Sequence, residues 1–212
     1  MQICFNTRNQ KSKFKNIKVM STTKSVKGTK TEQYLVNSFA AETQAYARYT
    51  FYAQIADKEL YFPIGVIFRE TADNELRHAK VFLKFLPNEE ATCTGGVDAG
   101  YLGDTASNLA IAIKEEATDG YEYYQEAAKV ATEEGFDEIA SHFLAIAEVE
   151  KYHHDRFQRY LKQVQDGTVW KRDTPINWQC LVCGYVHYGT EPPTKCPGCD
   201  HPYQHYMAMD DK

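Results

Sequence analysis

Apolar side chains recur every three to four residues along four long stretches of the chain, which is the period of an amphipathic α-helix. The pattern predicts helices over residues 31–57, 61–86, 105–132 and 136–165. Pro87 ends the second helix, and Gly135 marks a tight turn between the third and the fourth. Short joints within each pair and a long glycine-rich connection over residues 87–104 predict an all-α four-helix bundle with a crossover between helices 2 and 3.

Four glutamates lie within the apolar faces of these helices. Glu42 precedes Glu75 by 33 residues, and Glu116 precedes Glu150 by 34. A carboxylate without a partner in an apolar interior is costly, and four that converge also repel one another. The pattern therefore indicates that cations lie between them. The two halves of the bundle, each a helix pair with the same order of glutamates, are typical of an internal duplication.

Glu75 and Glu150 each begin a Glu-x-x-His motif, with His78 and His153, so each pair lies on one helical face. One glutamate on each of two helices and Glu-x-x-His on each of the other two form the ligand set of bundle sites for paired iron or manganese. One imidazole per metal suits iron better than a closed zinc-type site. The sequence predicts a dinuclear, non-haem metal centre.

Two C-x-x-C pairs, separated by twelve residues, stand near the end of the chain: Cys180, Cys183, Cys196 and Cys199. Four thiolates in this arrangement predict a closed tetrahedral site for zinc or for one iron. Alone, the pattern favours a structural zinc site. Beside a redox-active dinuclear centre, iron is the better interpretation, because it can supply electrons one at a time. Cys4 and Cys93 remain; Cys93 is more typical of an inert loop cysteine than of a peroxide-sensitive thiol.

Length and charge narrow the function classes. A chain of 212 residues with 43% hydrophobic content can hold one sizeable core and one small module. Its net charge of −5 makes a nucleic-acid partner an unfavourable hypothesis. No apolar run approaches the roughly 20 residues of a membrane helix. With paired cysteines typical of a reducing compartment, we expect a soluble cytoplasmic protein that acts away from membranes.

The first 30 residues carry eight basic and no acidic side chains. They are compatible with a disordered basic tail, an organellar transit peptide, or an extension before a natural start at Met20; the scarcity of arginine favours the first and the third. The expected organisation is a basic extension over residues 1–30, a bundle over 31–165, a linker over 166–177 and a cysteine module over 178–212.

Over about residues 25–208 the chain resembles the rubrerythrin family, in which a ferritin-like di-iron domain precedes a short rubredoxin-like domain. The matching strings are Phe39-Ala-Ala-Glu42-Thr-Gln-Ala, Glu70-Thr-Ala-Asp-Asn-Glu75-Leu-Arg-His78-Ala-Lys, Glu133-Glu-Gly-Phe, Glu150-Lys-Tyr-His153 and the cysteine tail with Gly184-Tyr-Val-His187. The resemblance implies that Glu75 and Glu150 bridge two irons. It also implies terminal ligands: Glu42 on one iron, and Glu116 and His153 on the other. His78 would be the ligand that the first iron takes up on reduction.

Asp119 departs from the family pattern. The third helix of the family usually carries Glu-x-x-Glu, whereas this chain has Glu116-Ala-Thr-Asp119. Aspartate is shorter by one methylene, and reaches the metal only with a shift of the helix or a bridging water. We predict that the redox-linked movement of the first iron is reduced and that His78 binds it in both states.

Tyr49 and Tyr124 lie seven residues after Glu42 and eight after Glu116, respectively. Periodicity alone favours an interpretation as ordinary core aromatics. The resemblance instead implies that both hydroxyls form hydrogen bonds with metal-bound carboxylates in the catalytic centre.

The resemblance also implies a peroxidase that protects against oxidative stress. Hydrogen peroxide would be reduced to water at the di-iron centre with electrons from the four-cysteine iron, itself refilled by an external reductase or a rubredoxin. Because family dimers bring one chain's cysteine module to the other chain's bundle, we expect a homodimer or a larger homo-oligomer. One alternative is a ferroxidase that sequesters iron, although it needs no electron inlet. A bare electron carrier, the other alternative, needs fewer inward carboxylates.

Overall fold

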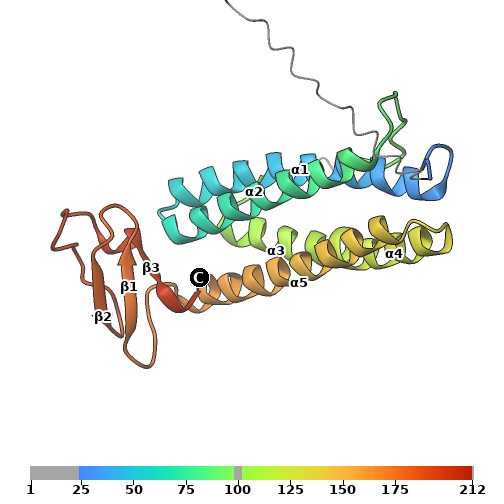
Figure 1. Ribbon diagram of the computed structural model, residues 1–212. Helices are drawn as coiled ribbons and strands as arrows, with labels where there is room; N and C mark the ends of the chain where they lie inside the picture. Colours follow the sequence, from blue (N-terminus) through green and yellow to red (C-terminus); the bar gives the residue numbers. More distant parts are fainter. Residues whose placement is uncertain (1–23, 98–101, 212) are drawn as a thin grey trace, which may run out of the picture.

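A computed structural model describes residues 24–97 and 102–211 of the chain. Long helices lie side by side in a bundle, and a small β module stands at one end of it (Figure 1). The helical elements are α1 (Lys30–Lys58), α2 (Phe62–Phe85), α3 (Thr105–Glu115), the π-helical segment η1 (Glu116–Glu122), α4 (Tyr123–Glu133) and α5 (Asp137–Asp166). Since α3, η1 and α4 follow one another without a break, they form the third rod of a four-helix bundle, as predicted.

The third rod is not one regular α-helix, so the prediction of uninterrupted α-helix over residues 105–132 is wrong in its middle. The π-helical segment η1 occupies Glu116–Glu122. A π-helical turn holds one residue more than an α-helical turn. A single extra residue changes the apolar period of a long helix too little for that period to reveal it.

The same turn closes both helix pairs. Leu60 after α1 and Gly135 after α4 both have left-handed backbones, with φ of 65° and 74°. The glutamate before each turn caps a helix of the other half. Glu134 accepts hydrogen bonds from the Thr31 N–H and hydroxyl at 2.8 and 2.7 Å, and Glu59 accepts one from the Thr105 N–H at 2.9 Å. These contacts fix the two pairs relative to each other.

Two buried apolar clusters fill the bundle on either side of the four inward glutamates. One contains Tyr52, Ile64, Phe68, Leu109 and Phe157 among others, and the second contains Leu35, Phe82, Ala127, Ile139 and Phe143 among others. Burial of such side chains stabilises the fold by about 25 cal/mol for each Å² of apolar surface. The glutamates are therefore held in a narrow polar layer between two apolar ones.

The β module is a three-stranded antiparallel sheet in the order β2-β1-β3, made of β1 (Ile176–Cys180), β2 (Val186–Gly189) and β3 (Tyr206–Ala208). It packs on the bundle through aromatic rings. His205 of the module stacks on Phe62 with centroids 3.8 Å apart, and Trp170, in the segment that leads into the module, stacks on Tyr61 at 5.7 Å. The module is thus anchored at the end of the bundle where α2 begins (Figure 1).

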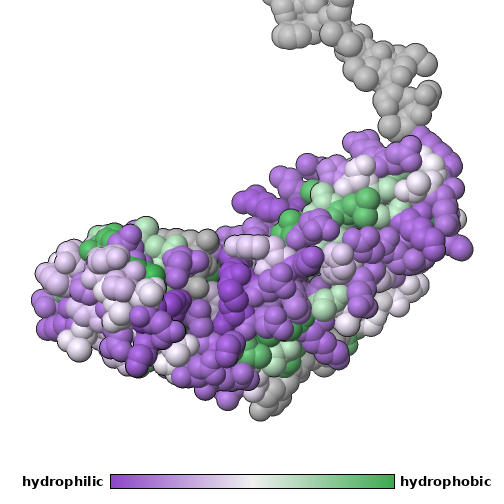
Figure 2. Space-filling view, turned by 90° about the horizontal axis from the view of Figure 1, so that it is seen from below, coloured by the Kyte–Doolittle hydropathy of each residue, from purple (hydrophilic) through white to green (hydrophobic). Residues whose placement is uncertain are grey.

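The exterior is mainly hydrophilic on the face drawn in Figure 2, with hydrophobic residues in small separate groups. Among the residues that the structure describes, no helix combines the length and the apolar character that a membrane span requires. Most of the predicted basic extension, including Cys4 and the candidate start Met20, lies outside the described residues. The boundaries proposed for the extension, the bundle, the linker and the cysteine module remain predictions.

Candidate metal centres

The four inward glutamates meet at the middle of the bundle. Each is at least nine-tenths buried, with exposed fractions of 4% for Glu42, 1% for Glu75, 4% for Glu116 and 2% for Glu150. Their oxygens and the two histidines form two groups in which all ligand atoms lie within 4.8 Å: Glu42, Glu75, His78 and Glu150, and Glu75, Glu116, Glu150 and His153. Both groups contain Glu75 and Glu150. This is the geometry of two adjacent cation sites with two shared carboxylates.

The two histidines face the shared glutamates in the same way. His78 Nδ1 lies 2.9 Å from Glu75 Oε2 and 3.1 Å from Glu150 Oε1. His153 Nδ1 lies 3.1 Å from Glu75 Oε1 and 3.1 Å from Glu150 Oε2. Each ring therefore turns its Nδ1 toward one oxygen of each shared carboxylate, as a ligand atom for a metal must.

Two buried tyrosines hold the other two glutamates, each from the opposite half of the bundle. The Tyr49 hydroxyl donates to Glu116 Oε1 at 2.6 Å, and the Tyr124 hydroxyl donates to Glu42 Oε1 at 2.5 Å. Hydrogen bonds from ligand-orienting groups of this kind fix the direction of a carboxylate and tune its basicity. One oxygen of each terminal glutamate is thus held in place before any cation binds.

Burial strongly disfavours the charged forms of the two terminal glutamates, Glu42 and Glu116. It raises the pKa of Glu42 well above the ordinary value, and the charges of Glu150 and Glu75 add to the effect. Burial and the charge of Glu150 raise the pKa of Glu116 to about 7. For His78, burial alone lowers the pKa, but hydrogen bonds with Glu150 and Glu75 outweigh it and raise the pKa to about 9. The chain alone therefore relieves its charge repulsion by holding protons.

Two divalent cations would replace those protons, since their charge balances four carboxylates. The structure supports such a fit independently of charge. Glu75 Oε1 and Glu150 Oε1 are buried without a well-aligned hydrogen bond, although a histidine nitrogen lies 3.1 Å from each. A buried carboxylate oxygen without such a bond is costly unless a cation takes its place. The mixture of carboxylates with one imidazole per site suits iron.

Asp119 lies apart from both groups. Its side chain is exposed, and Thr118 Oγ1 lies 3.1 Å from its Oδ1. The structure therefore brings together six of the seven residues predicted as ligands of the dinuclear centre and leaves Asp119 outside.

Sequence reasoning did not single out Gly120 and Asn74. A Cβ atom on Gly120 would lie 2.8 Å from Glu150 Cγ and 2.9 Å from Glu150 Cβ, so only glycine fits against this ligand. The available signal was a glycine inside a predicted helix. Asn74 Nδ2 lies 3.1 Å from His153 Nε2. The Asn74 amide, which offers both donor and acceptor atoms, orients the ring while Nδ1 faces the glutamates.

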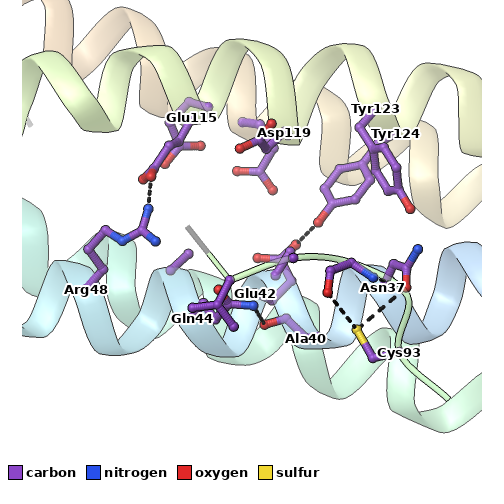
Figure 3. A pocket seen from close by; sticks show the side chains of 18 of the residues that line it. Asn37, Ala40, Glu42, Gln44, Arg48, Cys93, Glu115, Asp119, Tyr123 and Tyr124 are labelled. Carbon is purple, nitrogen blue, oxygen red and sulfur yellow. Dashed lines mark hydrogen bonds and ion pairs between the residues drawn. The ribbon is translucent and has the colours of Figure 1, made fainter. Parts of the chain in front are cut away.

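A cavity of about 440 Å³ leads to the glutamates between α1 on one side and η1 and α4 on the other (Figure 3). Glu42, Glu116 and Glu150 form part of its wall, together with residues of the segment from Cys93 to Val97. Arg48 and Glu115 form an ion pair across it. The cavity is a route by which a small molecule can reach the centre.

The four cysteines of the β module also converge. Their sulfur atoms all lie within 4.8 Å of one another, with 3.7 Å between Cys180 and Cys199 and 3.6 Å between Cys183 and Cys196. A tetrahedron of sulfurs around a metal with bonds of about 2.3 Å has edges of about 3.8 Å. The thiolate cage therefore has the size that one tetrahedral metal ion requires.

Comparison with known proteins connects both centres to one family. The family model described as rubrerythrin matches residues 33–94 and 107–178, and the model of the rubrerythrin rubredoxin-like domain matches residues 178–207. The chain is 44% identical to a rubrerythrin of Porphyromonas gingivalis over 186 residues, which cover 88% of this chain and 93% of the relative. It is 42% identical to a rubrerythrin of Clostridium perfringens over 190 residues, covering 88% and 97%.

Solved structures share the fold. The fully reduced, all-ferrous nigerythrin is 25% identical and superimposes with a TM-score of 0.57, covering 98% of this chain and 100% of that one. The predicted ferritin-like bundle with a C-terminal rubredoxin-like domain is thereby confirmed. So are the predicted cofactors, a non-haem di-iron centre and one iron on four cysteines. The chain belongs to the rubrerythrin family of di-iron oxidoreductases associated with oxidative stress.

Proposed function

We propose that this protein is a peroxidase that reduces hydrogen peroxide to water, with electrons that pass through the four-cysteine iron. The balanced reaction takes one H₂O₂, two electrons and two protons to two water molecules. The observation that supports it most is the presence, in one chain, of two cation sites with shared carboxylates and a thiolate cage for a single metal. An external reductase or a rubredoxin would refill the cage with electrons.

The inward-facing residues would have distinct roles at the di-iron centre. Glu75 and Glu150 would hold both irons; Glu42 and His78 would complete one site, and Glu116 and His153 the other. When bound, a ferrous pair supplies the two electrons that cleave one O–O bond. Tyr49 and Tyr124 keep the terminal glutamates directed inward, because a carboxylate that swings away loses a buried hydrogen bond. Peroxide and protons would arrive through the cavity beside Glu42 and Glu116.

We further propose that electrons cross between chains of a homodimer or larger assembly. Within one chain the cysteine module stands at the end of the bundle (Figure 1), and an apolar cluster that includes Phe68 and Phe157 lies between that end and the glutamates. A second chain that brings its module to the flank of this bundle would shorten the path. Sedimentation velocity of the iron-loaded protein tests this: a monomer would contradict the proposal.

An anaerobic experiment tests the peroxidase proposal. The protein is reduced, excess reductant is removed, and one equivalent of peroxide per di-iron centre is added while the absorbance of the cysteine-bound iron is recorded. We expect the oxidised colour to return. A sample that stays bleached, or a metal analysis that finds zinc on the cysteines, would sink the proposal. Oxidation of added Fe(II) with retention of the product as mineral would instead favour iron sequestration.

Cys183→Ser separates the two centres. This variant loses one ligand of the thiolate cage and leaves the bundle unchanged. We expect steady turnover with a reductase to be lost, while pre-reduced bundle iron still consumes one equivalent of peroxide. Equal loss of both reactions would show that the cage is not the electron inlet.

A further inference from the structure

The cavity beside the metal centre is larger than hydrogen peroxide requires. Its volume is about 440 Å³. A water molecule takes about 30 Å³ in the liquid, so two cations, a solvent ligand and one peroxide would occupy only part of the space. The remainder extends from the glutamates toward the segment that carries Cys93, Gly95 and Val97. Hydrogen peroxide needs this extension only as a passage and does not fill it.

Small or apolar residues form most of the wall of the extension. Ala40, Ala41 and Ala45 line it from α1, beside the polar side chains of Asn37 and Gln44, and the chain from Gly95 to Val97 lines it where that segment packs against Asn37. The charged groups of the wall are carboxylates, with Arg48 as the single cation among the lining residues, and Arg48 is paired with Glu115. Such a wall repels an anion and gives a neutral apolar group a favourable place to bind.

We propose that the site also accepts neutral organic hydroperoxides, with the apolar group of the substrate in the extension beside Ala41 and Cys93. The inference rests on the proposed peroxidase function, and it widens the substrate class of the same centre. The O–O bond of ROOH breaks, two electrons from the reduced di-iron centre and two protons are taken up, and ROH and water leave. An anionic hydroperoxide, such as one with a carboxylate tail, is expected to react poorly.

The first test compares two oxidants in a single turnover. Reduced, iron-loaded protein is mixed anaerobically with hydrogen peroxide or with cumene hydroperoxide. We expect cumene hydroperoxide to reoxidise it at a rate within about tenfold of that of hydrogen peroxide, which corresponds to a difference in activation free energy of at most about 1.4 kcal/mol. If only hydrogen peroxide reacts, this inference is overturned and the peroxidase proposal stands. If neither oxidant reacts, the peroxidase proposal fails, and this inference fails with it.

The second test measures binding without turnover. Cys93 is exposed and lines the cavity, so its alkylation by a maleimide reports on occupancy of the extension. We expect cumyl alcohol, the product of cumene hydroperoxide, to slow alkylation of the Cys93 peptide in a saturable way, as measured by mass spectrometry. An alkylation rate that is independent of cumyl alcohol overturns the inference, whatever the state of the irons.

Ala41→Leu narrows the extension, and Ala47→Leu adds the same side chain to α1 outside the cavity lining. We expect Ala41→Leu to lower the ratio of the cumene hydroperoxide rate to the hydrogen peroxide rate by about tenfold or more, the range typical of added methylenes in a pocket. Ala47→Leu should leave that ratio unchanged. Equal ratios in the two variants would contradict the proposed position of the apolar group.

Discussion

The first helix pair and the second pair differ by one residue between the terminal glutamate and the buried tyrosine. That step is seven residues in α1 and eight in the third rod. From the tyrosine to the left-handed turn both halves take eleven residues, and from the turn to the shared glutamate both take fifteen. The whole difference therefore falls in the region of η1, where a π-helical turn accommodates one extra residue.

The π-helical turn preserves the symmetry of the ligands. Eight α-helical steps would turn Tyr124 about 80° away from Glu116, at about 100° per residue, whereas the wider turn restores a common face. Tyr124 consequently reaches Glu42 just as Tyr49 reaches Glu116. The extra residue alters the backbone next to the ligands, where Gly120 comes close to Glu150. The two halves thus differ in local helix geometry, but their metal-binding residues are arranged alike.

The largest effect is expected from Gly120→Ala, which adds a methyl group where the backbone of η1 lies close to Glu150. The new methyl group would sit under 3 Å from Glu150 Cβ and Cγ, the stem of a shared ligand, which has little freedom to move. We expect a loss of about 1–3 kcal/mol in the free energy of unfolding, as for overpacked cores, together with a fall in bundle iron. Thermal unfolding and metal analysis measure the two effects.

Gly96→Ala is the matched control, since a Cβ at that residue meets nothing within 4 Å. It should keep both the stability and the iron content of the parent protein. If Gly120→Ala behaved like this control, the contact between η1 and Glu150 would be looser than the structure shows.

The ligand layer could be predicted from the sequence because its rule is simple. A charged residue inside an apolar helical face must be compensated, and Glu-x-x-His puts two ligands on one face. The π-helical turn was missed because apolar periodicity does not show one extra residue; only the comparison of the two halves shows it, as seven residues from Glu42 to Tyr49 against eight from Glu116 to Tyr124. Asn74 was missed for a different reason: a half-buried polar residue on a helix is common, and only the position of His153 on another helix gives it a role.

Tyr49→Phe and Tyr124→Phe test whether the halves are equivalent. Each removes one hydroxyl whose acceptor is a buried carboxylate oxygen, at 2.6 and 2.5 Å. We expect each to cost about 1–3 kcal/mol in the metal-free protein, because the oxygen is left unsatisfied. The two costs should be similar, because the two hydrogen bonds have nearly the same length and both acceptors are buried. A much smaller cost for Tyr124→Phe would show that η1 has weakened its contact.

The two turns offer a smaller contrast, because the same left-handed backbone is occupied by Leu60 in one half and by Gly135 in the other. Gly135→Ala should lower the free energy of unfolding by about 1 kcal/mol, since residues with a side chain avoid this conformation. Leu60→Gly relieves the same strain but makes the unfolded chain more flexible, so the net change should stay within about 0.5 kcal/mol. Chemical denaturation measures both, and a large gain from Leu60→Gly would mean that the strain had been underestimated.

The smallest effect is expected at Asp119, three residues after Glu116; the corresponding position in the first half, three after Glu42, is Ala45. Because Asp119 is exposed and outside both ligand groups, Asp119→Asn should leave the iron content unchanged, whereas His78→Gln should remove iron from its site. Each half then contributes one terminal carboxylate, and Asp119 lines the cavity beside them without joining either ligand group. We therefore expect His78 to bind that iron in both redox states. Crystal structures of the oxidised and reduced protein decide the matter: Asp119 on the oxidised iron, replaced by His78 on reduction, would refute this prediction.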